Sequence, residues 1–183
     1  MKKIILIVLI FFNFNASSQT YDGIELGKSL IYTQKIIYNK GYKFEYSLDS
    51  NITCYSKYVN NKKIDLIIVF TPKSKLVWKI VVAIDYINNW KQLKETYVKY
   101  TTALSSVYGN NIENEVVFKF PYQEGDGNEL EALYLEKAYI YTIYKDENDN
   151  LIMLEVNPLE KNYSRIIIHF ENNITSEINK KEI

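Results

Sequence analysis

The stretch from Lys75 to Asn110, KLVWKIVVAIDYINNWKQLKETYVKYTTALSSVYGN, changes its hydrophobic period part-way and so indicates the fold class. In its first part apolar side chains recur at every second residue, which predicts a strand with one buried face formed by Trp78, Ile80, Val82 and Ile84. After Asn89, a predicted N-cap, they recur at spacings of three and four. This spacing predicts an amphipathic helix that ends at Gly109 and packs through Trp90, Leu93, Tyr97, Tyr100, Leu104 and Val107.

The same order of elements occurs on both sides of this helix. Residues 27–42 predict a first helix, followed by strands over 51–59, 63–70 and 75–86. Further strands are expected over 115–120, 137–145, 151–156 and 164–171, with turns at 146–150 and around Pro158. We therefore predict an α+β fold in which two tandem helix-plus-antiparallel-sheet units, about 21–87 and 88–183, pack as one domain over 19–183.

The first 18 residues have the three parts of a signal peptide. Lys2 and Lys3 precede the apolar run Ile4–Phe12, and small residues follow at Ala16–Ser18. A membrane-spanning helix needs roughly 20 apolar residues, and this run has nine. We expect cleavage after Ser18 and export to the periplasm or the medium, with no membrane span in the mature chain; a retained anchor is the alternative.

Composition excludes several classes of protein. Without Lys2 and Lys3 the chain has 20 basic and 22 acidic residues, a charge near −2, and Arg165 is its one arginine. Nucleic-acid-binding proteins usually have a basic surplus, so no nucleic-acid partner is expected. Cys54 is the single cysteine, which rules out an intrachain disulfide; we expect a buried thiol rather than a reactive one.

No catalytic motif is present. His169 is the single histidine, and its strand alternation groups it with Arg165 and Ile167 as a partly exposed residue. The chain has no G-x-S-x-G nucleophile elbow, no phosphate-binding glycine loop and no cluster of histidine and cysteine ligands. We expect no cofactor, no metal site and no enzymatic activity. A hydrolase that uses two carboxylates stays open as an alternative.

The segment 121–136, PYQEGDGNELEALYLE, has no counterpart in the first half and is the predicted functional insert. Its carboxylates could hold a calcium ion, but the EF-hand spacing is absent. A structural turn explains them more simply, with Asn128 capping a short helix and Glu131 in its first turn. A calcium-stabilised structural protein therefore stays open as a second alternative. The segment Asp146–Leu151 is expected to be a hairpin turn.

Tyrosine is abundant, with 17 residues in 183. Strand alternation places Tyr139 and Tyr141 on one face and Ile140 and Tyr144 on the other. Tyrosine is common where a surface must be both apolar and wettable, as in protein interfaces; half-buried packing is the alternative reading. The candidate ligand-binding residues are Tyr122, Glu124, Asp126, Tyr139 and Tyr141.

Several stretches resemble a family of small exported proteins of Gram-negative bacteria: YDGIELGKS (21–29), VWKIVVAI (77–84) and, most specifically, PYQEGDGNELEAL (121–133). That family has no assigned activity. The repeated helix-plus-sheet plan is also similar to the architecture of beta-lactamase-inhibitor-protein-like domains. That resemblance implies partner binding across a sheet face. We therefore expect an exported, non-catalytic binding module of the cell envelope that contacts a protein or a glycan through an exposed tyrosine-rich sheet face and the 121–136 insert.

Overall fold

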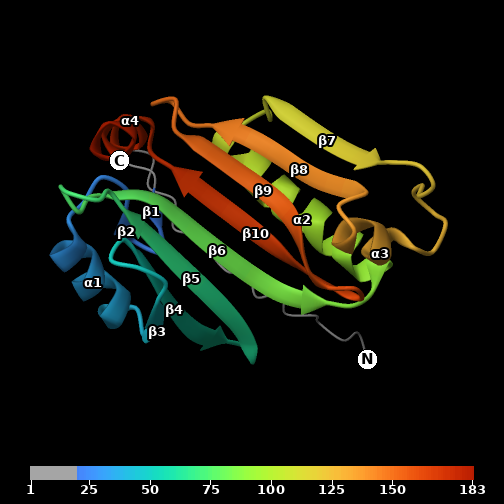
Figure 1. Ribbon diagram of the computed structural model, residues 1–183, viewed down its shortest axis with the longest axis horizontal. Coiled ribbons are helices and arrows are strands. Elements are labelled where there is room, and N and C mark those ends of the chain that lie inside the picture. The colour runs from blue at the N-terminus through green and yellow to red at the C-terminus, as the bar shows by residue number, and fades with distance from the viewer. Residues whose placement is uncertain (1–19) are drawn as a thin grey trace, which may run out of the picture.

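The computed structural model describes residues 20–183, which form an α+β fold built on a large antiparallel sheet (Figure 1). The predicted fold class is therefore confirmed. The predicted signal peptide, residues 1–18, lies outside the described residues.

Within residues 20–183 the main sheet has eight strands in the order β3-β4-β5-β6-β10-β9-β8-β7, and every neighbouring pair is antiparallel. The central pair, β6 and β10, joins the first four strands to the last four. A separate short hairpin consists of β1 (Thr20–Tyr21) and β2 (Ile24–Glu25). The strands of the main sheet are β3 (Lys43–Ser47), β4 (Ile52–Val59), β5 (Lys62–Phe70), β6 (Val77–Ile87), β7 (Glu113–Phe118), β8 (Ala138–Lys145), β9 (Leu151–Glu160) and β10 (Tyr163–Glu171).

The helices of the described residues are α1 (Leu30–Asn39), α2 (Trp90–Tyr108), α3 (Glu129–Tyr134) and α4 (Asn173–Glu182). The predicted N-cap of α2 is confirmed, because Asn89 Oδ1 accepts a hydrogen bond from Gln92 N (2.9 Å). Gly109 ends this helix with φ of 78°, a conformation that glycine adopts without steric cost. α2 lies behind the sheet, roughly along the direction of β8 and β9, and packs against β6, β8, β9 and β10 (Figure 1).

The main hydrophobic core lies between the helices and one face of the sheet. The predicted apolar face of α2, which we call the α2 stripe, is confirmed for its central residues, since Leu93, Tyr97, Tyr100 and Leu104 are buried. It is wrong for Val107, which is 44% exposed in the last turn. From the sheet, alternate residues of β5, β6, β8, β9 and β10 complete the core, including Leu66, Ile80, Val82, Tyr144, Leu154, Ile168 and Phe170.

Two strand predictions need correction. Trp78 was expected to share the buried face of its strand, but Val69 pairs with Lys79 and Phe70 with Val77, so Trp78 is the extra residue of a bulge. Val77 is fully buried in its place. Pro158 was expected in a turn; it lies inside β9 opposite Ser164, next to a register shift that accommodates its missing N–H.

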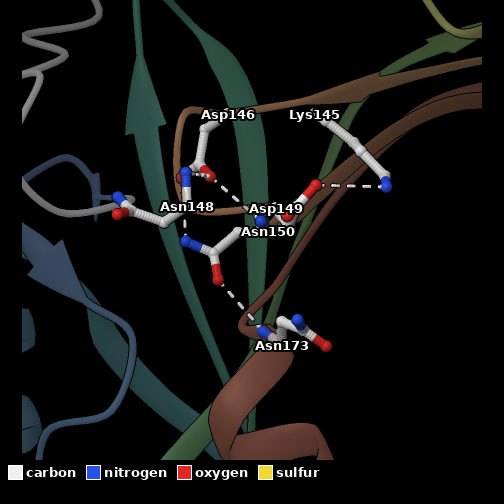
Figure 2. A network of polar contacts seen from close by, with 6 residues as sticks. All are labelled: Lys145, Asp146, Asn148, Asp149, Asn150 and Asn173. Carbon is white, nitrogen blue, oxygen red and sulfur yellow. Dashed lines mark hydrogen bonds and ion pairs between the residues drawn. The ribbon is translucent and has the colours of Figure 1, made fainter.

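The turn between β8 and β9 connects the sheet to the C-terminal helix (Figure 2). Asp146 Oδ1 accepts hydrogen bonds from Asn148 N (2.8 Å) and Asn150 N (2.9 Å), which confirms the predicted hairpin turn. The buried Asn150 side chain donates to Asp146 Oδ2 (2.8 Å) and accepts from Asn173 N (3.0 Å). The first turn of α4, a helix that was not predicted, is thereby attached to the end of the sheet.

Candidate functional site

The two faces of the main sheet have different surroundings. The buried apolar residues of α1, α2 and α3 belong to the core on one face, which we call the covered face. On the other face, which we call the open face, no helix of residues 20–183 packs (Figure 1). An uncovered sheet face is a broad surface on which alternate residues of several strands lie side by side. It is therefore the principal candidate for binding.

A small apolar cluster lies at the centre of the open face. Val81, Ala83 and Ile167 are buried there, with the half-buried Ile67 against them. These residues come from β5, β6 and β10 at matching register positions. Since no helix covers this cluster, neighbouring long side chains of the same face shield it from water.

Asp65 is the centre of a polar cluster beside these apolar residues. Its carboxylate accepts a hydrogen bond from Tyr86 OH (2.7 Å) and pairs with Lys63 Nζ (2.9 Å), while Arg165 Nη1 lies 4.0 Å away. The hydrogen bond to Asp65 raises the pKa of Lys63. Partial burial, followed by the bond to Asp65, raises the pKa of Tyr86. The chain's one arginine thus lies over a carboxylate that already has two other partners.

Two further polar contacts join β10 to its neighbouring strands. His169 Nε2 lies 3.0 Å from Glu155 Oε1 on β9, and Lys79 Nζ on β6 lies 2.5 Å from Glu171 Oε1. The predicted grouping of Arg165, Ile167 and His169 on one face is confirmed by this arrangement, and His169 is partly exposed as expected. Because these side chains pair across neighbouring strands, they form a polar layer around the apolar cluster.

Tyr139 and Tyr141 also lie on the open face, as predicted, while Ile140 and Tyr144 are buried on the covered face. The two tyrosine rings are stacked, with centroids 6.2 Å apart and an interplanar angle of 20°. Tyr141 OH donates a hydrogen bond to Glu113, and this bond raises the pKa of Tyr141. We call this stacked ring pair, at the β7 end of the open face, the tyrosine platform.

Cys54 lies on the open face at the opposite end, on β4. Its thiol is buried, as predicted, and burial raises its pKa. Tyr46 of β3 is its cross-strand partner. A buried thiol with a raised pKa is a weak nucleophile, so the structure gives this residue a packing role.

The residues of the 121–136 insert lie apart from the tyrosine platform. Tyr122 packs against the main core, and Glu124 forms an ion pair with Lys94 of α2. Asp126 accepts hydrogen bonds from Gln123 N (3.0 Å) and Asn128 N (2.7 Å), which is the pattern of a structural turn. The five candidate residues therefore fall into two groups. Tyr139 and Tyr141 lie on the open face, whereas Tyr122, Glu124 and Asp126 lie in the insert and contact the core, α2 or the insert's own turn.

The other carboxylates of the insert also have protein partners. The buried Glu129 accepts a hydrogen bond from Gly125 N (2.9 Å), and Glu131 pairs with Lys161 (2.8 Å). The predicted short helix begins at Glu129, but Asn128 makes no side-chain capping bond to it. Among residues 20–183 no group of three or more histidine, cysteine, aspartate or glutamate side chains is arranged to hold a metal ion.

Comparison of the chain with protein families, curated proteins and solved structures finds no match. The resemblances named above stay predictions. In the described part of the chain no helix combines the length and the apolar character needed to cross a membrane.

Proposed function

We propose that this protein is an exported, non-catalytic binding module of the cell envelope, and that it holds a protein partner on the open face of its sheet. Export is inferred from the signal-like residues 1–18. The observation that carries the binding role is the uncovered sheet face, on which an apolar cluster is surrounded by paired charges and tyrosines.

The composition of this face supports a protein partner rather than a small ligand. Protein interfaces combine an apolar centre with a polar rim and are enriched in tyrosine and arginine. On the open face Asp65 and Arg165 supply polar groups and Tyr141 an aromatic ring, while Val81 and Ile167 are buried beneath this layer and support it from below. The surface extends over several strands, as a standard interface of about 800 Å² on each partner requires.

The insert is the second part of the proposal. Its Glu124 forms an ion pair with Lys94 of α2, on the side of the sheet that the helices cover. We therefore assign the insert to a separate contact and not to the open face. A glycan ligand on the Tyr139–Tyr141 platform is an outcome that the experiment below distinguishes.

Chemical-shift mapping by NMR tests the open-face proposal. The ¹⁵N-labelled chain is titrated separately with fractionated envelope proteins and with glycan fragments, and binding to the responding fraction is then measured for variants. Tyr141→Ala should weaken binding about tenfold or more, because interface tyrosines are often dominant anchors. The matched control is Tyr38→Ala, which removes an exposed tyrosine from α1, outside both the open face and the insert, and should leave the affinity unchanged.

Shifts confined to the amides of the helical side, or equal losses in both variants, would contradict the open-face assignment. A response to glycan fragments alone would replace the protein partner with a sugar.

A further inference from the structure

The outer edge of β7 differs from the other edge of the sheet. β7 pairs with β8 without any register shift from Glu113 to Phe118. At the opposite edge, β3 has a bulge between Phe44 and Tyr46, a feature that discourages pairing with another strand. β7 is therefore the regular edge of this sheet, and Figure 1 shows it at the margin, outside the line of α2.

The register shows which backbone groups of β7 face outward. Lys119 N donates to Lys137 O (2.6 Å), which continues the pairing of Phe118 with Ala138. Hydrogen-bonded pairs recur at every second residue of an antiparallel ladder, so the odd-numbered residues of β7 bond to β8. The N–H and C=O groups of Asn114, Val116 and Phe118 point away from β8, and no strand of residues 20–183 pairs with them.

An apolar groove of about 300 Å³ lies directly under this edge, between β7 and α2. Val98 of α2 and Val116 of β7 line it and are 55% and 49% exposed, which is high for facing valines. Ile140 and Val156 form its floor, and the Lys94–Glu124 ion pair lies at its rim. The volume is at the lower limit for a drug-sized ligand, but it suits one or two aliphatic side chains.

The charges beside the edge point to a basic occupant. Glu113 and Glu115 project from β7 on the open face; Glu113 accepts a hydrogen bond from the neutral Tyr141 OH, and no lysine or arginine of the described residues forms an ion pair with either carboxylate. A strand added to β7 would place every second side chain opposite these carboxylates and the intervening ones opposite Asn114 and Val116, above the groove. Antiparallel self-pairing of β7 about Val116 would place Glu115 opposite Val117 and only Glu113 opposite a cation, Lys119, whereas a basic peptide can supply a cation to both carboxylates.

We propose that the β7 edge and the adjoining groove bind an extended peptide as an added strand, with apolar side chains entering the groove and basic side chains between them facing Glu113 and Glu115. Backbone hydrogen bonds to Asn114, Val116 and Phe118 supply the general affinity, and the groove and the two carboxylates supply the selectivity. This site is separate from the open-face surface.

Fluorescence anisotropy with a short labelled peptide of alternating valine and lysine tests the proposal on the unmodified chain. Two N-methylated versions of the peptide provide the matched comparison. In one, the methyl groups block the N–H groups on the edge that pairs with β7; in the other, they block those on the opposite edge. We expect about a tenfold or greater loss of affinity for the first set only, and a similar loss when glutamate replaces lysine.

A protein variant gives an independent test. Val116→Pro removes an outward N–H that has no partner in the sheet, so the fold should persist while peptide binding is lost. Val116→Ala keeps that N–H and should retain most of the binding; circular dichroism checks the fold of both variants. Absence of peptide binding, equal effects of the two methylated sets, or self-association that Val116→Pro abolishes would each overturn the proposal, the last in favour of a second copy.

Discussion

The two faces of the sheet use the same strands for different purposes. On β10, Ile166, Ile168 and Phe170 lie under the helices, whereas Arg165 and His169 alternate with them on the open face. The covered side chains are removed from water by other parts of the chain. The open side chains are shielded only by one another, through ion pairs and hydrogen bonds across neighbouring strands.

This difference has an energetic consequence. A fully buried aliphatic or aromatic side chain stabilises a protein by about 1.5–3 kcal/mol, whereas a partly exposed ion pair contributes about 0–1 kcal/mol. The charged layer of the open face therefore contributes little to folding. Its pairing keeps a regular array of polar groups in place at low cost in stability, which is what a preorganised binding surface requires.

The largest effect should distinguish neighbours on β10 that face opposite ways. Phe170→Ala removes a fully buried ring from the core and should lower the free energy of unfolding by about 3–5 kcal/mol. His169→Ala removes a partly exposed ring and its contact with Glu155, and should cost about 1 kcal/mol or less. Urea unfolding followed by circular dichroism measures both. Comparable losses would show that something also covers the open face.

A second difference separates buried and exposed side chains within the β8–β9 turn. Asn150→Ala removes both the bond to Asp146 and the acceptor for Asn173 N, and should cost about 1–3 kcal/mol because buried polar groups lose their partner. Asn148→Ala is the control, since Asn148 is exposed and bonds to Asp146 through its backbone. Hydrogen exchange in α4 should increase in the first variant only. Unchanged exchange would mean that Asn150 does not anchor this helix.

Sequence periodicity was sufficient for the elements with a strong apolar pattern. The α2 stripe and the faces of β8 and β10 follow from spacing alone, because their side chains are sorted by burial. β3 was missed because all its residues are exposed and it is bulged, which leaves no alternation to read. α4 has few apolar residues, but the sequence NNITSE contains an N-cap pattern that could have predicted it. In the structure Asn172 Oδ1 accepts a hydrogen bond from Thr175 N (2.8 Å).

The open-face site was only partly predictable for a different reason. Tyr139 and Tyr141 share a strand, so alternation groups them. Asp65 is on β5 and Arg165 is on β10. These two strands flank β6 in the sheet, so the two side chains approach each other across it. That neighbourhood depends on strand order, a long-range property that local periodicity does not contain.

The smallest expected effect compares two tyrosine hydroxyls with hydrogen bonds of equal length on opposite faces. Tyr97 OH lies 2.7 Å from Thr142 Oγ1 on the covered face, and Tyr86 OH donates to Asp65 (2.7 Å) on the open face. Tyr97→Phe should cost about 1 kcal/mol at pH 7, and Tyr86→Phe about half of that or less, because water can replace the exposed partner.

Alkaline pH sharpens this comparison. Burial raises the pKa of Tyr97 from 10.0 to about 12. Between these values the unfolded chain releases the proton that the folded chain retains, so this contribution to stability is complete below pH 10 and is lost as the pH rises toward 12. Tyr97→Phe lacks the titrating group, so the stability difference from the unaltered protein should shrink over this range in urea unfolding curves. A constant difference up to pH 12 would show that Tyr97 ionises in the folded state as readily as in water, and the covered face would then be more accessible at this point than its packing indicates.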